Sequence, residues 1–361
     1  MSNKVSFRSI DMSEKLVMAL VGFGNSANRY HLPYLLENEN VQIKTIYTPS
    51  LNKRPEDQAA LEARGIVFTD DLDQVVNDSE IQFVSVITPA PSHFELAKRL
   101  LEAGKNVMVE KPFVTSVAEG KELIALANEK GLLITPFQNR RFDGEFMELQ
   151  YILDHGFIGE PIEVESHFDY FRPGAASNPG TQIDGAFYGY GVHPLDQITK
   201  LWGKPEAVAY DIKSVTNPEG VDDNFEVNMY YGKLRAKLKT SFLVADQYPK
   251  YILHGTNGSF IKYGMDAQEN DILAGISPSE PNFGADNPDN YGVIKYINAY
   301  GDPVEHKMET PRGNYGLMYQ NCVDVILHGA EKEVTDEQIL TQLEILDAGF
   351  KEQGPHIQHF A

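Results

Sequence analysis

The sequence is poor in cysteine and has no long hydrophobic run. Its single cysteine, Cys322, excludes an intrachain disulfide and a zinc site built from several cysteines. A membrane-spanning helix needs about 20 apolar residues in succession, and no such stretch is present. The N-terminal region also lacks the apolar segment of a secretory signal. We therefore expect a cytoplasmic protein without disulfides or a membrane partner.

Positive charge is also scarce. Lys and Arg number 31 against 52 Asp and Glu, which gives a formal net charge of -21. A nucleic-acid partner requires a basic surface that displaces counterions, so none is expected. The histidines lack the close spacing of metal ligands, and we expect no metal site. With 361 residues and 42% hydrophobic content, the chain should form about two globular domains.

The most informative stretch is KLVMALVGFGNSANRYHLP, residues 15–33. An apolar run typical of a buried strand ends in a G-x-G-x-x-A pattern, and a helical pattern follows. In such a strand–turn–helix unit the glycines allow a tight turn and a close approach of the backbone to a pyrophosphate, and the helix N-terminus faces the phosphates. The residues expected at the cofactor from this turn are Gly22, Gly24, Asn25, Ser26 and Ala27.

The remaining pattern divides the chain in two. From residue 16 to residue 135 apolar runs alternate with helical segments such as 92–103 and 116–130, which predicts a doubly wound parallel (Rossmann) sheet. After residue 138, short alternating runs predict an α/β domain with a large, mainly antiparallel open sheet. Late helices over 314–328 and 335–351 are expected to cover one face of that sheet. The expected division is a polar extension at 1–14, a dinucleotide-binding domain at 15–137 and a second domain at 138–361.

The ends of the expected parallel strands supply further cofactor candidates. The second strand ends in IYTPSLNKR, without the acidic residue that binds the ribose 2'-hydroxyl of NAD. Hydroxyl groups and positive charges stand there instead, which favours NADP with NAD possible, although the basic residues could be ordinary solvated side chains. The candidates are Thr48, Ser50, Lys53, Arg54, Thr88, Pro89, His93, Glu110 and Lys111. His93 is equally well explained as a packing histidine.

Lys111 is also a candidate for catalysis. It leaves a buried strand in the run VEKP. Burial lowers the pKa of a lysine and makes it suitable for polarising a substrate hydroxyl or carbonyl. A salt bridge with Glu110 and an ordinary exposed lysine are the alternative explanations.

Three stretches resemble a known family. LVGFGNSANRYHLP, VITPAPSHFELAKRLLEAGKNVMVEKPF and YGYGVHPLDQ, in this order and spacing, are similar to the glucose-fructose oxidoreductase and inositol dehydrogenase family, Gfo/Idh/MocA. FQNRRFDGEF and VESHFDYFRPG are similar to a branch that includes NADP-dependent scyllo-inositol dehydrogenases. The resemblance implies an NADP-preferring oxidoreductase that acts on a secondary hydroxyl of a cyclic polyol or sugar. Its active site would lie between the domains, and a homodimer or homotetramer would form through the second-domain sheet.

The resemblance also implies residue roles and reveals a departure. Lys111, followed by a cis bond to Pro112, would contact the reacting hydroxyl and the nicotinamide, and His193 would accept the proton. Where the family has an aspartate four residues before that histidine, this chain has Gly189. Asp196, on the same predicted helix, is expected either to hold His193 or to make a purely structural pair, and Asp184 is a more distant candidate. Two other functions therefore stay open: a cofactor-binding sensor with weak or no turnover, and a redox-assisted glycosidase.

Substrate contacts are expected near the first strand of the second domain. Alternation places Glu163, Glu165, His167 and Asp169 on one face and Val164, Ser166, Phe168 and Tyr170 on the other, and only one set can face the cleft. Sugar recognition requires aromatic surface and hydrogen-bond donors. These requirements favour Tyr170, Arg172 and Tyr188. At the domain junction, Asn139, Arg140 and Arg141 either contact a ligand or pin the domains together.

Overall fold

The computed structural model describes residues 15–174 and 180–351, so the expected polar extension at 1–14 lies outside the described residues. The first domain is built on a six-stranded parallel sheet of order β3-β2-β1-β4-β5-β6. Its strands are β1 (Leu16–Val21), β2 (Val41–Tyr47), β3 (Val67–Thr69), β4 (Phe83–Val86), β5 (Asn106–Val109) and β6 (Ile134–Pro136). This confirms the doubly wound parallel sheet. Strand β3 was not predicted, because it has three residues and its Val67 is exposed.

The helices of this domain are α1 (Leu32–Leu35), α2 (Pro55–Glu62), α3 (Asp73–Val76), α4 (His93–Glu102) and α5 (Val117–Lys130). Of these helices, α5 begins and ends at the residues that its sequence indicates. The Ser116 side chain accepts a hydrogen bond from the backbone N–H of Glu119, and Gly131 ends α5 in the left-handed conformation. Ser92 precedes α4 but does not cap it with its side chain, because its hydroxyl donates towards Thr88 and Pro89.

The second domain contains an eight-stranded sheet of order β14-β13-β12-β11-β7-β10-β9-β8. All neighbouring strands are antiparallel except β7 and β10. The strands are β7 (Pro161–His167), β8 (Ala207–Lys213), β9 (Asn224–Tyr231), β10 (Leu234–Ser241), β11 (Tyr251–Gly255), β12 (Gly258–Lys262), β13 (Gly292–Ile297) and β14 (Pro303–Met308). The mainly antiparallel second sheet is therefore confirmed.

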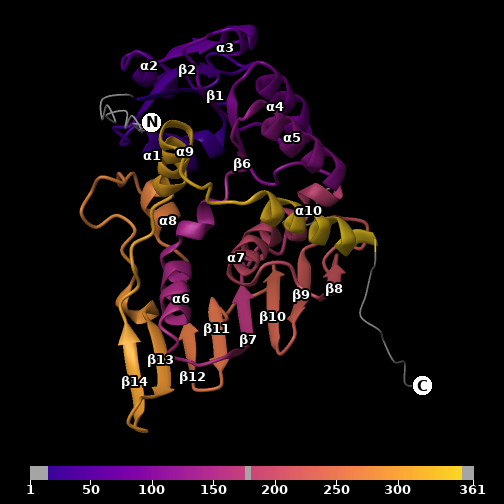
Figure 1. Ribbon diagram of the computed structural model, residues 1–361, viewed down its shortest axis with the longest axis vertical. Coiled ribbons are helices and arrows are strands. Elements are labelled where there is room, and N and C mark those ends of the chain that lie inside the picture. Colours follow the sequence, from indigo (N-terminus) through magenta and orange to yellow (C-terminus); the bar gives the residue numbers. More distant parts are fainter. Residues whose placement is uncertain (1–14, 175–179, 352–361) are drawn as a thin grey trace, which may run out of the picture.

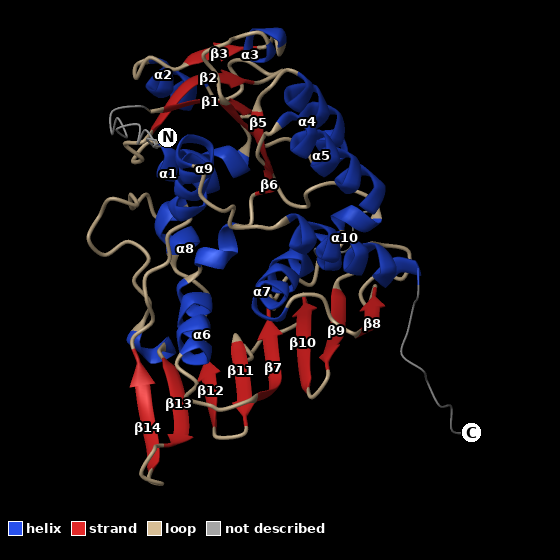
Figure 2. Cartoon of the chain, viewed as in Figure 1, coloured by secondary structure: helices blue, strands red, loops and turns tan. Residues whose placement is uncertain are grey.

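Helices separate the two sheets. α6 (Gly144–Asp154) and α7 (Val192–Trp202) lie on the face of the second sheet that is directed towards the first domain, and the short α8 (Gln268–Leu273) lies between α6 and the first domain (Figures 1 and 2). Val164 is fully buried on this face, whereas Glu163 points to the other face and pairs with Arg235. The predicted alternation along β7 thus directs Phe168 and Tyr170 towards the domain junction.

The sequence predicts that both late helices cover one face of the second sheet. In the structure, α9 (Gly316–His328) packs in the first domain and α10 (Asp336–Lys351) contacts the cores of both domains. α9 buries Met318, Tyr319 and Cys322 in the core of the first domain. α10 contributes Leu343 to that core and Leu346 to the core of the second domain. An apolar helical face does not encode which sheet it will contact. The chain therefore returns to the first domain after completing the second sheet.

Candidate active site

A cavity of about 830 Å³ lies where the carboxyl ends of β4 and β5 meet the residues after β7 and the start of α7. Both domains contribute its walls. Of the predicted site residues, Asn25, Ser26, Thr88, Pro89, Glu110, Lys111, Tyr170, Arg172 and His193 line it. Crevices at the carboxyl ends of parallel strands are where doubly wound sheets bind ligands.

The glycine turn is shaped to accept a ligand closely. Gly22 has a φ of 121°, and a Cβ atom there would lie 2.3 Å from the carbonyl oxygen of Ile87. A Cβ atom at Gly24 would meet no protein atom within 4 Å, so the backbone at this point borders open space. Ala27 is fully buried behind the turn. This arrangement fits the pyrophosphate of a dinucleotide, which needs a tight turn and an uncovered backbone.

The end of β2 lies beside this turn. Thr48 is buried, and its hydroxyl accepts a hydrogen bond from the backbone N–H of Ser50 at 3.3 Å. Arg54 donates a hydrogen bond to the Asn25 side chain, and Lys53 forms no salt bridge within the described residues. None of these four β2-end candidates lines the cavity itself. Thr48, Ser50, Lys53 and Arg54 together form a rim next to the glycine turn, called the basic rim below.

Glu110 is the centre of a buried hydrogen-bond network. Its carboxylate accepts hydrogen bonds from the Ser26 hydroxyl and from the backbone N–H of Lys111, and it lies 2.9 Å from Nε2 of His31. Burial alone would raise the pKa of Glu110, but the hydrogen bond and charge of His31 and the nearby Lys111 lower it to about 2. His31 in turn contacts the Tyr319 hydroxyl at 2.6 Å. Helix α9 thereby helps to fix the strand end that carries Lys111.

Lys111 points across the cavity to the second domain. The Lys111–Pro112 peptide bond is cis, as the resemblance implied. Nζ of Lys111 donates a hydrogen bond to the carbonyl oxygen of Gly189 at 3.1 Å. Burial lowers the pKa of Lys111, the charge of Glu110 raises it, and the charge of Arg140 lowers it further. One of the two alternatives, a salt bridge with Glu110, is absent from the described structure.

His193 lies in the first turn of α7 and faces the same cavity. It is 5% exposed and stacks on Phe168, with the ring centroids 5.7 Å apart. Burial and the charges of Lys111, Arg140 and Lys250 hold its pKa well below the usual value of 6.5. Its Nδ1 atom has no hydrogen-bond partner among the described residues. Both burial and the nearby positive charges therefore favour the neutral form of the His193 imidazole.

Two sequence models match the two halves of the chain. The model of the GFO_IDH_MocA oxidoreductase family with an NAD-binding Rossmann fold matches residues 16–137, and its C-terminal alpha/beta domain model matches residues 152–355. The chain belongs to the Gfo/Idh/MocA family. This confirms the resemblance in the sequence and identifies an oxidoreductase family with a nucleotide-binding domain.

Individual relatives cover almost the whole chain. The uncharacterized oxidoreductase YhhX of Escherichia coli is 50% identical over 93% of this chain and 96% of its own length. IolW of Bacillus subtilis, a scyllo-inositol 2-dehydrogenase (NADP(+)), is 30% identical over 94% of each chain. The crystal structure of an oxidoreductase from Bacillus cereus superposes with a TM-score of 0.92 at 48% identity, covering 96% of this chain and 100% of that one.

Asp196 does not hold His193 in this Gfo/Idh/MocA protein. Its two carboxylate oxygens accept hydrogen bonds from Nε and Nη2 of Arg141 at 2.8 and 2.7 Å, and Gln342 donates to the carboxylate as well. Of the two expectations for Asp196, the structure therefore supports the structural pair. Asp184 accepts hydrogen bonds from the backbone and hydroxyl of Thr181. Neither carboxylate takes the place of the family aspartate at Gly189.

Two other predicted residues lie outside the cavity. Tyr188 is 5% exposed and packs in the hydrophobic core of the second domain, where its ring stacks on Phe350. The π-helical turn η6 (Phe187–Gly191) directs Tyr190 into the cavity instead. His93 is 1% exposed, and its ring nitrogens lie within hydrogen-bonding distance of the carbonyl oxygens of Pro112 and Thr88. It is a packing histidine that holds two cavity loops together.

Tyr170 and Tyr190 form an aromatic wall of the cavity, and an ion-pair network completes the site. Arg172 donates a hydrogen bond to the Tyr190 hydroxyl at 3.0 Å, and its guanidinium carbon lies 4.1 Å from the ring centroid of Tyr170. Sequence reasoning missed Arg29 and Glu269, which pair at 3.3 Å. Arg140 pairs with the same Glu269 at 3.3 Å and lines the cavity. Arg141 does not line the cavity and is buried in a structural ion pair with Asp196. The i, i+4 spacing of Asn25 and Arg29 was the available signal for Arg29.

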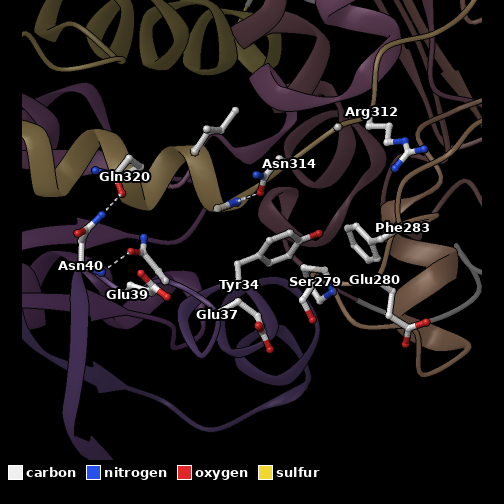
Figure 3. Close-up of a pocket in the computed structure, with 15 residues that line it drawn as sticks. Tyr34, Glu37, Glu39, Asn40, Ser279, Glu280, Phe283, Arg312, Asn314 and Gln320 are labelled. Carbon is white, nitrogen blue, oxygen red and sulfur yellow. Dashed lines mark hydrogen bonds between the residues drawn. The ribbon is translucent and has the colours of Figure 1, made fainter.

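Among the described residues, a second hollow lies apart from the predicted site residues. It has a volume of about 660 Å³ and lies between α1, α9 and the loop around Phe283 (Figure 3). Some of its polar side chains pair with one another or with neighbouring residues, as in the hydrogen bond from Asn40 to Gln320. Within the described residues there is no group of three side chains that could hold a metal ion. No helix in that part of the chain has the length and apolar character to cross a membrane.

Proposed function

We propose that the protein is an NADP-preferring dehydrogenase that oxidises a secondary hydroxyl of a cyclic polyol or sugar, or reduces the corresponding ketone. The observation that carries this proposal is the convergence of Lys111 and His193, from different domains, on one cavity beside an uncovered glycine turn. A bound nicotinamide would supply the hydride chemistry at the carbinol carbon. Gly22, Gly24, Asn25 and Ser26 would hold its diphosphate, and Thr88 and Pro89 would border its ribose.

The two candidate catalytic side chains have complementary roles in oxidation. The Lys111 ammonium group stabilises the negative charge that develops on the substrate oxygen. The neutral imidazole of His193 accepts the hydroxyl proton as general base. The carbonyl of Gly189 orients the ammonium group, and the Glu110 network fixes the strand end behind it. In ketone reduction the same proton returns from His193.

The preference for NADP rests on the basic rim beside the glycine turn. Lys53 and Arg54 can pair with a 2'-phosphate, and no acidic residue stands at the end of β2 to bind a 2'-hydroxyl. The name of IolW, an NADP(+)-dependent relative, supports the same choice and the polyol substrate class. The aromatic wall with its hydroxyl and guanidinium donors suits a sugar ring.

Assembly and location are further parts of the proposal. The face of the second sheet directed away from the helices carries exposed apolar side chains, including Tyr230 and Ile261. We place the contact of a homodimer or homotetramer on this face.

A cytoplasmic location agrees with the single, fully buried free cysteine.

Replacement of Lys111 by Met tests the proposal. The change keeps the length of the side chain and removes the charge that stabilises the alkoxide, so turnover should fall at least about 100-fold, while NADPH binding is retained. Nicotinamide absorbance measures turnover, and fluorescence titration measures binding. Lys98→Met, at a half-buried position of α4 remote from the cavity lining, is the matched control. Turnover that survives in Lys111→Met would remove Lys111 from the mechanism.

A further inference from the structure

The cavity differs in charge from the rest of the molecule. Although the chain has a formal net charge of -21, the described residues that line the cavity include four cationic side chains against three carboxylates. The cations are Arg29, Lys111, Arg140 and Arg172, and the carboxylates are Glu110, Asp184 and Glu269. A positive cavity in an acidic protein concentrates anionic ligands.

All three carboxylates are already engaged. Glu110 binds Ser26, His31 and the backbone of Lys111. Asp184 accepts two hydrogen bonds from Thr181, and Glu269 is shared between Arg29 and Arg140. Among the described residues, neither Lys111 nor Arg172 forms a salt bridge with a carboxylate.

These two cations line the same cavity as Gly189 and Tyr190 of the second domain. Lys111 rests on the carbonyl of Gly189, and Arg172 is bound to Tyr190, the next residue along the chain. A Cβ atom at Gly189 would meet no protein atom within 4 Å, so open space lies beside this residue. Gly189 also precedes His193 by about one helical turn, so the space borders the face that carries His193.

The cofactor does not account for this charge. The phosphates of a dinucleotide bind at the glycine turn of the first domain. Arg172 and Gly189 belong to the second domain, with the aromatic wall. Burial lowers the pKa of His193 most, and the positive charges of Lys111, Arg140 and Lys250 lower it further. A negative group in the open space would pair with Arg172 and make protonation of His193 more favourable.

Resting on the proposed function, we propose that the substrate is a sugar or cyclic polyol with an anionic substituent, carboxylate or phosphate. The anionic group binds beside Gly189 and Arg172, while Lys111 faces the reacting hydroxyl. Arg172 offers planar donors for such a group, and Tyr190 holds the guanidinium in place. The anionic group of the substrate thereby takes the place of the family aspartate, where this chain has Gly189.

The first test compares matched substrates. A neutral hexose, the hexuronic acid and the hexose 6-phosphate of the same configuration are each assayed with NADP, and oxidation is followed by nicotinamide absorbance. We expect kcat/KM for at least one anionic member to exceed that of the neutral hexose by about tenfold or more, which corresponds to about 1.4 kcal/mol. The better anion identifies the substituent. Equal or better turnover of the neutral hexose would overturn the inference while leaving the proposed dehydrogenase intact.

The second test transfers the charge from substrate to protein. Gly189→Asp places a carboxylate in the open space, and Gly189→Asn is the uncharged control of the same size. We expect Gly189→Asp to reduce the ratio of anionic to neutral turnover by about tenfold or more and Gly189→Asn to reduce it less. Arg172→Gln should lower the same ratio. Unchanged ratios in Gly189→Asp and Arg172→Gln would contradict the assignment.

Binding keeps the inference testable if no hexose is turned over. Isothermal titration of the NADPH-bound protein with the hexuronic acid and the hexose 6-phosphate should show binding of an anion that Gly189→Asp and Arg172→Gln weaken. Absence of turnover together with such binding would contradict the proposed function alone. Absence of binding by both anions would contradict the inference. Unfolding temperatures of the variants establish that each is folded.

Discussion

Gly22 and Gly24 stand two residues apart but meet different demands. Gly22 needs its positive φ and the absence of a side chain against Ile87, whereas Gly24 only borders open space. We expect Gly22→Ala to lower the free energy of unfolding by about 1–3 kcal/mol or more, because strained backbone and a clash are combined. Gly24→Ala should unfold like the wild type and bind NADPH more weakly.

Denaturant unfolding and NADPH titration of both variants separate the two roles. A Gly24→Ala variant that binds NADPH with unchanged affinity would show that the cofactor does not approach this turn. A Gly22→Ala variant of unchanged stability would contradict the backbone argument.

Titration of His193 and Lys111 sets the expected pH profile. His193 must be neutral to accept a proton, and its pKa lies well below 6.5, so kcat/KM for oxidation should fall with decreasing pH only well below 6.5. Lys111 must be protonated, and its lowered pKa places the alkaline decline below 10.5. The profile of the wild type across pH checks both limbs. An acidic limb at or above pH 6.5 would contradict the role assigned to the buried His193.

At the scale of elements, Arg141 joins α7 to the first turn of α10 and to Glu333 in the loop before it. Its guanidinium binds Asp196 through two hydrogen bonds and also reaches Gln338, and both members of the ion pair are almost fully buried. We expect Arg141→Met to lower the free energy of unfolding by about 3–5 kcal/mol, because it leaves Asp196 buried without its counter-charge.

Lys204→Met is the control for this prediction. Lys204 pairs with Glu344 at the surface, and exposed pairs contribute about 0–1 kcal/mol. Urea unfolding of both variants gives the comparison. Equal, small losses would show that the Arg141–Asp196 pair contributes little to stability.

The sequence predicted the elements better than their side-chain registers. Alternating apolar runs indicated five of the six strands of the first sheet, and Ser116 and Gly131 marked the limits of α5. The aromatic site residue was misassigned to Tyr188 because the π-helical turn η6 changes the winding of the chain just before α7. The partner of Asp196 could not be predicted either, since Arg141 lies 55 residues away in sequence. Such long-range pairs depend on tertiary packing.

At the scale of the whole molecule, α10 links the two hydrophobic cores. Leu343 lies in the first core and Leu346 in the second, within one turn of the same helix. We expect Leu343→Ala and Leu346→Ala each to lower the free energy of unfolding by about 2–5 kcal/mol, and both to shift one shared transition. Trp202 fluorescence reports the second domain, and far-UV circular dichroism reports both domains.

The diagnostic variant is Leu343→Ala. If the domains unfold together, a change in the first core moves the Trp202 transition as far as the dichroism transition. A Trp202 transition that stays in place while the dichroism curve splits would show that the domains unfold independently.

The central claim is that the cavity between the domains transfers a hydride between NADP and a hydroxylated ring. The most direct measurement is nicotinamide absorbance with NADP and NAD across inositols, sugars and their acidic derivatives. We predict substrate-dependent reduction that is faster with NADP and is lost in Lys111→Met. NADPH binding without turnover of any substrate, or sugar release without a net change in absorbance, would contradict the claim and favour a sensor or a redox-assisted glycosidase.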